Sequence, residues 1–179
     1  EQEVASLLAS VPGRSAGDRR DLALLELLYA TGARISEAVG LSVDDIAGSV
    51  ARLGGPRARA VPYGGAAARA LETWLAPGGR PVMTGAGRRH APPDDAALFV
   101  NARGGRLSRQ WGWAIVKDRA RHAGLQGHLG PHVLRHSFAA HLAARGAPVA
   151  VVQQLLNGHP AILDPASLAD AYARWHPRT

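Results

Sequence analysis

The chain has 179 residues, a length that suits one domain, and 46% of them are apolar, which is enough for a buried core. Its formal net charge of +7 favours a polyanionic partner, most simply nucleic acid. The lack of cysteine excludes disulfides, a thiolate nucleophile and cysteine-based zinc sites, and it suits the cytoplasmic location that we expect.

The first part of the chain predicts helices. Residues 1–10 predict a short helix, and GDRRDLALLELLYATG (17–32) predicts a longer, buried one from the spacing of its Leu and Ala residues. Asp18 is the expected N-cap of this helix, and Gly32 is the expected left-handed residue that ends it. The stretch ARISEAVGLSVDDI (33–46) predicts a second helix, a turn and the start of an extended segment. No apolar run is long enough to span a membrane, and no helix with a Lys/Arg-rich face favours a membrane surface as partner.

The middle of the chain predicts two small hairpins separated by a helix and a loop. In SVARLGGPRARAVPYGG (49–65), two short extended runs flank a Gly-Gly-Pro turn. AAARALETWLA (66–76) predicts a helix, and the Gly- and Pro-rich residues 77–95 predict a loop with basic Arg88, Arg89 and His90. ALFVNARGGRLS (97–108) predicts the second hairpin.

The last third predicts four more helices. Ser108 is the expected cap of RQWGWAIVKDRARHAG (109–124), and Pro131 and Gly146 are expected to begin and end the next helix. APVAVVQQLL (147–156) and ASLADAYARWH (166–176) complete the series. The expected fold is therefore mainly α with small β-hairpins, an α+β class.

Four cationic or imidazole side chains are candidates for a phosphate site. His132 and Arg135 are three residues apart on one helix, so they share a face. Arg34 follows a helix-ending glycine, and His159 follows another helix in the turn NGHP. Arginines can neutralise the non-bridging oxygens of a phosphoryl transition state while an imidazole handles protons.

Other interpretations of these residues are open at this point. A single His-x-x-Arg pattern on a helix is common on solvated faces. His132 and His136 have the spacing of a helical zinc pair, but the glutamate of a metalloprotease is missing and Arg135 would repel a cation, so we expect no metal site. A helix-turn-helix regulator is another candidate, with APVAVVQQLLNGHP as part of it; it leaves Arg34 and the His-x-x-Arg pattern unexplained.

Three long stretches, in the right order, resemble the catalytic domain of the tyrosine recombinases, the phage-integrase family, and within it the bacterial Xer branch. They are LLELLYATGARISEAVGLSVDDI, LFVNARGGRLSRQ and PHVLRHSFAAHLAARGAPVAVVQQLL. The resemblance implies an enzyme for site-specific DNA recombination, in which a tyrosine attacks a DNA phosphate and forms a 3′-phosphotyrosyl link. It implies no metal or nucleotide cofactor, and a Xer role in resolving chromosome dimers during chromosome partition and cell division.

The resemblance also assigns roles to residues. Arg34 and Arg135 match the two arginines that bind the scissile phosphate, His132 matches the histidine of His-x-x-Arg, and His159 matches a later position that holds a phosphate oxygen. The further DNA contacts that we expect are arginines of the two hairpins and of the helix that follows: Arg57, Arg59, Arg106 and Arg109. The partners implied are double-stranded DNA and other recombinase protomers, in a tetramer assembled through the C-terminal helix.

The chain departs from the family pattern in three places. The hairpin has no lysine to act as general acid, and arginine holds its proton too tightly for that role. Asn157 is an extra residue before Gly-His, and the segment that carries the family's nucleophile, similar to TTQIYTH, is missing. Tyr172 is the tyrosine nearest in sequence to His159 and is the remaining candidate nucleophile. The alternative function is a catalytically inactive DNA-binding module of the same fold.

The resemblance covers nearly the whole chain. We expect residues 1–179 to form a single C-terminal catalytic domain, with the family's N-terminal DNA-clamping domain absent. The missing lysine and tyrosine segments separate the two functions: an active enzyme needs them, and a DNA-binding module does not.

Overall fold

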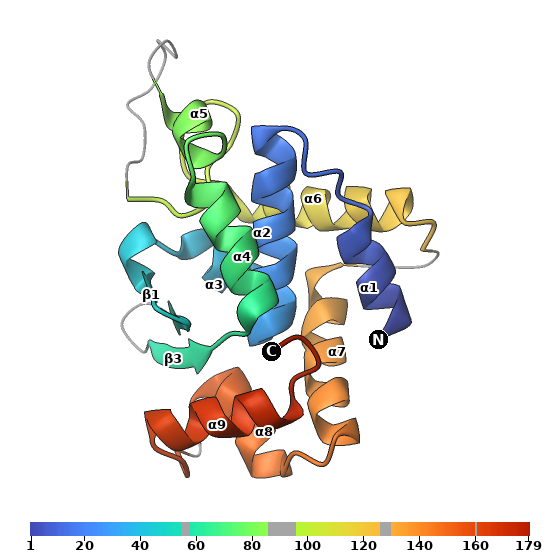
Figure 1. Cartoon of the computed structure of the whole chain (residues 1–179), viewed down its shortest axis with the longest axis vertical. Coiled ribbons are helices and arrows are strands. Elements are labelled where there is room, and N and C mark those ends of the chain that lie inside the picture. The colour runs from blue at the N-terminus through green and yellow to red at the C-terminus, as the bar shows by residue number, and fades with distance from the viewer. Residues whose placement is uncertain (55–57, 86–95, 126–129, 160) are drawn as a thin grey trace.

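Helix α2 (Ala16–Thr31) is the central element of the computed structural model, and helices α1, α3, α4, α5, α6 and α7 all contact it (Figure 1). Four of its five leucines, Leu24, Leu25, Leu27 and Leu28, are fully buried. A helix that is apolar on every side is stable only inside a protein, so the others assemble around it. The structure describes residues 1–54, 58–85, 96–125, 130–159 and 161–179.

Both ends of α2 show why the helix stops where it does. Ser15, not Asp18 as predicted, is the N-cap: its hydroxyl accepts a hydrogen bond from the Asp18 N–H (3.0 Å), and the Asp18 carboxylate accepts one from the Ser15 N–H (3.1 Å). This reciprocal arrangement satisfies two backbone donors at once. At the other end, Gly32 adopts the predicted left-handed conformation with φ of 60°.

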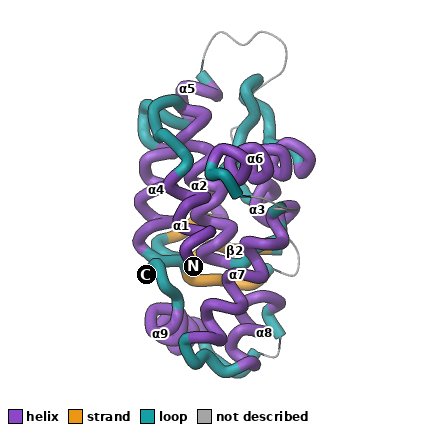
Figure 2. The backbone as a smooth tube through the Cα atoms, turned by 90° about the vertical axis from the view of Figure 1, so that its right-hand side faces the viewer, coloured by secondary structure: helices purple, strands orange, loops and turns teal. Residues whose placement is uncertain are grey.

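The other helices follow the predicted order, and the mainly α fold class with a small β-sheet is confirmed. Before the sheet come α1 (Gln2–Ala9), α3 (Ile35–Gly40) and the short 3-10 helix η1 (Val43–Asp45). After it come α4 (Gly65–Leu75), α5 (Arg80–Thr84), α6 (Arg109–His122), α7 (Pro131–Ala144), α8 (Val149–Asn157) and α9 (Pro165–Trp175). Helices α8 and α9 lie at the opposite end of the molecule from α5 (Figures 1 and 2).

The first predicted hairpin is present as part of a three-stranded antiparallel sheet. Strand β2 (Val50–Leu53) pairs with β3 (Arg59–Pro62), with Leu53 opposite Arg59, and the short β1 (Ile46–Ala47) pairs with the other edge of β2. The hairpin tip, with Arg57, lies outside the described residues.

The second predicted hairpin is present in minimal form, and one loop prediction was wrong. Val100 and Arg106 make one antiparallel bridge, flanked by backbone hydrogen bonds from Asn101 to Gly105 (2.8 Å) and from Leu107 to Phe99 (2.9 Å). Leu98 also donates its N–H to the Leu41 carbonyl (2.9 Å), so this segment is held by the chain after α3. The segment predicted as a loop from residue 77 contains α5, whose Pro81 occupies the first turn, where no backbone donor is needed. Arg88, Arg89 and His90 lie outside the described residues.

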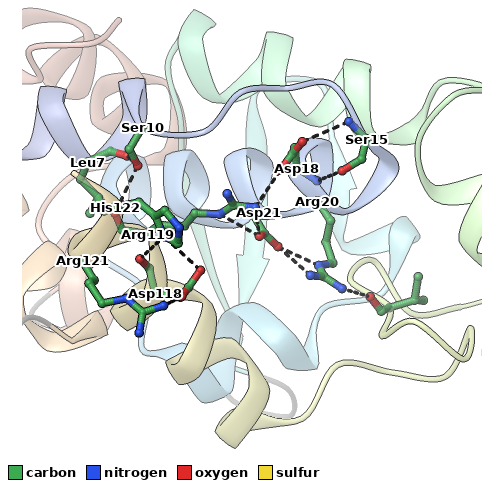
Figure 3. Close-up of polar contacts among 11 residues, drawn as sticks. Leu7, Ser10, Ser15, Asp18, Arg20, Asp21, Asp118, Arg119, Arg121 and His122 are labelled. Atoms are coloured by element: carbon green, nitrogen blue, oxygen red, sulfur yellow. Dashed lines mark hydrogen bonds and ion pairs between the residues drawn. The ribbon is translucent and has the colours of Figure 1, made fainter. Parts of the chain in front are cut away.

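A network of ion pairs joins the start of α2 to α6 (Figure 3). Asp21 is 5% exposed and accepts hydrogen bonds from Arg119 on α6 (2.7 and 3.0 Å) and from Arg20 (2.7 and 3.0 Å). Arg119 also donates to Asp18 (2.8 Å), and its backbone carbonyl accepts from Ser10 after α1 (3.2 Å). Buried charges are tolerated when each is paired and hydrogen-bonded, as these are.

The C-terminal residues are anchored on the body of the same chain. Arg178 pairs with Glu26 of α2, and burial raises the pKa of Glu26 even beside this partner. His176 is 2% exposed, and burial lowers its pKa to about 4, so its ring is neutral at neutral pH. Its ring packs against three others: Tyr29, Phe138 and Tyr172. Within the described ranges, no helix has the length and apolarity that a membrane crossing needs.

The network in Figure 3 predicts a large loss of stability on replacing Arg119. Arg119→Ala leaves Asp21 buried with one partner instead of two, and we expect the free energy of unfolding to fall by about 2–4 kcal/mol. The matched control is Arg121→Ala on the same helix, because the Arg121–Asp118 pair has side chains 77% and 45% exposed. Arg121→Ala should lower the free energy of unfolding by about 0.5 kcal/mol or less. Urea unfolding measures both, and equal losses would contradict a buried network.

Candidate nucleic-acid interface

Arg34 stands at the start of α3, two residues after the glycine that ends α2. Its backbone N–H donates to the Glu37 carboxylate (2.7 Å), which caps the short helix, while its guanidinium lies 3.5 Å from the same carboxylate. The Arg34 side chain is 57% exposed. The guanidinium is therefore held near the protein surface with most of its area open to a ligand.

Arg135, on α7, connects the C-terminal ends of two other helices, α2 and α8. One guanidinium nitrogen donates to the Gly32 carbonyl at the end of α2 (2.6 Å), and another donates to Leu156 (3.2 Å) and to the Asn157 side chain (3.0 Å) at the end of α8. Burial, together with the nearby Arg34 and Arg59, lowers the pKa of Arg135. Three arginines thus lie close enough to repel one another, which is the arrangement expected of an anion site.

Glu37 is the carboxylate that balances part of this charge. Arg59 on β3 binds both of its oxygens (2.7 and 3.1 Å) and donates to the Leu155 carbonyl on α8 (3.0 Å). Burial alone would raise the pKa of Glu37, but the hydrogen bonds from Arg59 and the Arg34 backbone lower it overall. Glu37 was missed by the sequence analysis, although its spacing from Arg34 is that of a helix cap.

The two histidines lie at the exposed rim of this arrangement. His132 is on the first turn of α7, one turn before Arg135, and the rings of His132 and His136 meet edge to face with centroids 6.1 Å apart. His159 follows Gly158, which ends α8 in a left-handed conformation. It lines a groove of about 750 Å³ together with Arg59 and Asn157.

Arg34 borders a second hollow, which shares one lining residue with the first. The second has a volume of about 520 Å³ and is lined by Arg34, Glu37 and Arg52, among others. Both are lined by Ala58, next to the Arg59–Glu37 pair. Arg135 binds Gly32, two residues before Arg34, and Asn157, two residues before His159, while His132 lies one turn before Arg135 on α7. Hereafter we call Arg34, His132, Arg135 and His159, the four residues that the sequence predicted for a phosphate site, the phosphate clamp.

Tyr172 is not brought to the phosphate clamp. It is 2% exposed, its hydroxyl accepts a hydrogen bond from the Gly64 N–H (3.2 Å), and its ring stacks on His176 at 4.6 Å. Burial raises the pKa of Tyr172. The other two tyrosines, Tyr29 and Tyr63, are 2% and 4% exposed, with their hydroxyls bonded to His141 and the Gly48 carbonyl. As folded here, no tyrosine hydroxyl of the chain can reach a phosphate at the clamp.

The other arginines predicted to contact DNA divide into two kinds. Arg59 and Arg106 have protein partners: Arg59 binds Glu37, and Arg106 donates to the carbonyls of Gly40 and Leu41 (2.6 and 2.8 Å). These contacts connect both arginines to the region of α3, and the DNA contacts expected of them stay predictions. Arg109 is exposed at the start of α6, and Arg57 lies outside the described residues. In the described part of the chain, no three His, Asp or Glu side chains gather as a metal site would require.

The fold and the clamp define a class of protein. The sequence profile of the phage integrase family matches residues 1–162. The chain therefore belongs to this family, the tyrosine recombinases, as the resemblance predicted.

Individual relatives agree with this assignment. Tyrosine recombinase XerD of Mycobacterium leprae (strain TN) is 45% identical over 192 aligned positions, which cover 98% of this chain and 60% of that protein. Tyrosine recombinase XerC of Roseiflexus sp. (strain RS-1) is 48% identical over 147 positions, covering 80% of this chain and 45% of that one. The chain thus spans about 60% of the length of the XerD relative.

Solved structures show the same fold. The crystal structure of XerA recombinase matches with a TM-score of 0.74 and 26% identity, covering 100% of this chain and 63% of that one. XerH recombinase bound to its difH substrate matches with a TM-score of 0.70 and 24% identity, covering 97% of this chain and 48% of that one. The second likeness, at this identity, concerns the fold alone.

The position of Glu37 leads to a prediction about stability. In Glu37→Ala, the Arg59 guanidinium, whose side chain is 10% exposed, loses its charged partner, and α3 loses its cap. We expect the free energy of unfolding to fall by about 2–4 kcal/mol. Glu72→Ala, at an exposed position on α4, is the control and should change it by about 0.5 kcal/mol or less. Chemical denaturation compares the two, and a loss for Glu37→Ala no larger than the control's would contradict the central role of this carboxylate.

Proposed function

We propose that this chain serves site-specific DNA recombination of the Xer type, resolving chromosome dimers, and that the phosphate clamp binds the DNA phosphate at which strands are cut and rejoined. The observation that supports this most directly is the convergence of two arginines and two histidines from α3, α7 and the turn after α8. The family relationship gives the reaction, and the clamp gives a place where it would occur.

The chemistry of the clamp suits a phosphoryl transition state. Arg34 and Arg135 would neutralise the non-bridging oxygens, because guanidinium groups bind phosphate through two parallel N–H donors. His132 would handle a proton, and His159 would donate a hydrogen bond to an oxygen. In the proposed reaction the tyrosine oxygen bonds to phosphorus, the 5′-oxygen leaves and takes up a proton, and a 3′-phosphotyrosyl ester remains. A 5′-hydroxyl from a partner duplex reverses these steps and frees the tyrosine.

A second function, DNA binding without cleavage, is favoured by a separate observation: all three tyrosines are buried and hydrogen-bonded. The alignment with the XerD relative spans 192 positions, more than the 179 residues of this chain, so that protein has residues that are opposite gaps here. The missing tyrosine segment is consistent with such a gap.

The assembly that we propose is a tetramer on DNA in which C-terminal helices connect protomers. Helix α9 has the amphipathic sequence that such a contact needs, with Leu168, Ala171 and Tyr172 on its buried face. In this structure that face packs on β3 and α8 of its own chain. If α9 packed on a neighbouring protomer, similar contacts there would therefore have to replace those that it makes with β3 and α8 of its own chain.

The clamp predicts how DNA affinity depends on Arg34 and on salt. Arg34→Ala removes one charged hydrogen-bond donor group, so affinity for duplex DNA should fall about tenfold. The slope of log affinity against log salt should become shallower by about 1, because one fewer counterion is released.

Arg14→Ala is the matched control for this measurement. Arg14 is exposed and precedes the other end of α2, a helix of 16 residues and therefore about 24 Å long. Arg14→Ala removes the same charge far from the clamp, so we expect the affinity for duplex DNA, measured by fluorescence-anisotropy titration, to change less than twofold. Equal effects of the two variants would contradict a localised phosphate site.

A covalent-trapping assay separates cleavage from binding. A nicked duplex, from which the cut strand end diffuses away, holds any phosphotyrosyl adduct, which then survives denaturing electrophoresis. The proposed recombination predicts such an adduct, whereas the second function, with the tyrosines staying buried, predicts binding of this duplex without one. An adduct would establish the cleaving enzyme, and its loss in Tyr172→Phe would show that Tyr172 leaves the core to react.

A further inference from the structure

Two side chains from different helices converge on Gly130, the residue just before α7. A Cβ atom at this glycine would lie 3.1 Å from two ring atoms of His132 and 3.1 Å from Nε1 of Trp113 on α6. Gly130 has φ of −136° and ψ of 178°, an extended conformation that any residue adopts. The glycine is therefore needed for space: it lets the imidazole and the indole approach the same point.

Trp113 has a cationic neighbour on its own helix, and that helix packs closely against α3. Lys117, one turn later and the only lysine of the chain, lies 5.6 Å from the centre of the indole ring. At the preceding residue, a Cβ on Gly112 would be 2.8 Å from Ile35 and 3.0 Å from Val39, so α6 is in tight contact with α3. Because Arg34 caps α3, this contact ties Trp113 to the helix that carries one arginine of the clamp.

His132, in contrast, has few restraints of its own. It is exposed on the first turn of α7, with the ring of His136 edge-on at 6.1 Å on one side. An exposed imidazole samples several rotamers, and ordering it on binding costs affinity. A neighbour that limits those rotamers before binding removes part of that cost.

We propose that Trp113 is a positioning residue for His132: with Gly130 leaving the space, the indole Nε1 lies beside the imidazole and limits the rotamers that His132 adopts before DNA binds. This inference rests on the proposed function of the clamp. It assigns a role to an indole that is 41% exposed beside a DNA-binding site and that no core contact explains.

The chain contains its own control for this proposal. Trp111, two residues earlier on the same helix, is 65% exposed and borders other hollows, with Arg20 and Asp21. Trp113→Leu should weaken binding of duplex DNA about three- to tenfold, the factor that ordering one side chain contributes. Trp111→Leu should change it less than twofold. Equal effects would overturn the proposal.

A double-mutant cycle separates positioning from direct contact. If Trp113 acts through His132, Trp113→Leu should have no further effect on DNA affinity in a His132→Ala background. If the two losses multiply instead, the indole contacts DNA by itself and the proposal is wrong.

A measurement without DNA separates this proposal from the function on which it rests. In proton–nitrogen NMR of the histidine rings, Trp113→Leu and Gly130→Ala should both shift the His132 signals, while Trp111→Leu leaves them unchanged. Unchanged His132 signals in Trp113→Leu would overturn the positioning role. Shifted signals combined with normal DNA affinity of Arg34→Ala would instead leave the contact standing and overturn the proposed function of the clamp.

Discussion

The position of Arg135 between two helix C-termini is the interaction on which the clamp depends. Its guanidinium binds the carbonyls of Gly32 and Leu156, where the negative ends of two helix dipoles meet. These partners, and the Asn157 amide, are neutral, so the hydrogen bonds fix the side chain without cancelling its charge. Arg34 is two residues after Gly32, and His159 is two residues after Asn157. Because Arg135 binds both Gly32 and Asn157, this one side chain sets the distance between the two turns.

Arg59 shows the contrasting use of the same residue type. Its guanidinium is bound by the Glu37 carboxylate, which compensates its charge locally. The pair connects β3 to α3, and the Arg59 bond to Leu155 connects both to α8. Of the three arginines in this region, one is therefore chiefly structural, while Arg34 and Arg135 retain charge for an anion. Residue type alone does not separate these roles: Arg59 binds both Glu37 oxygens and is 10% exposed, whereas Arg34 lies 3.5 Å from the same carboxylate and is 57% exposed.

The C-terminal segment explains why the chain has a clamp but no tyrosine beside it. The Tyr172 ring stacks on His176, whose ring also contacts Tyr29 and Phe138, and Arg178 then pairs with the buried Glu26. Gly64 has no room for a Cβ against the carbonyl of Arg178, which shows how closely the tail is packed. Moving Tyr172 to the clamp would disrupt all of these contacts together.

Local sequence patterns determined much of the fold. The periodicity of Leu and Ala predicted α2, the proline and glycine signals bounded α7, and the Gly-Gly-Pro turn predicted the β2–β3 hairpin, because each depends on neighbours along the chain. The same holds for His132 and Arg135, whose spacing places them on one helix face. The α2 cap was assigned to Asp18 instead of Ser15 because both residues take part in one reciprocal pair.

Only the tertiary structure decided which side chains meet across long separations. Arg135 and Gly32 are 103 residues apart, and Arg59 and Leu155 are 96 apart. No sequence spacing encodes such partners, because they depend on how helices pack around α2. For the same reason the sequence left Tyr172 as a candidate nucleophile and Arg59 and Arg106 as candidate DNA contacts, while packing buried the first and gave the others protein partners. It also gave Glu37 and Trp113 roles that their positions in the sequence do not reveal.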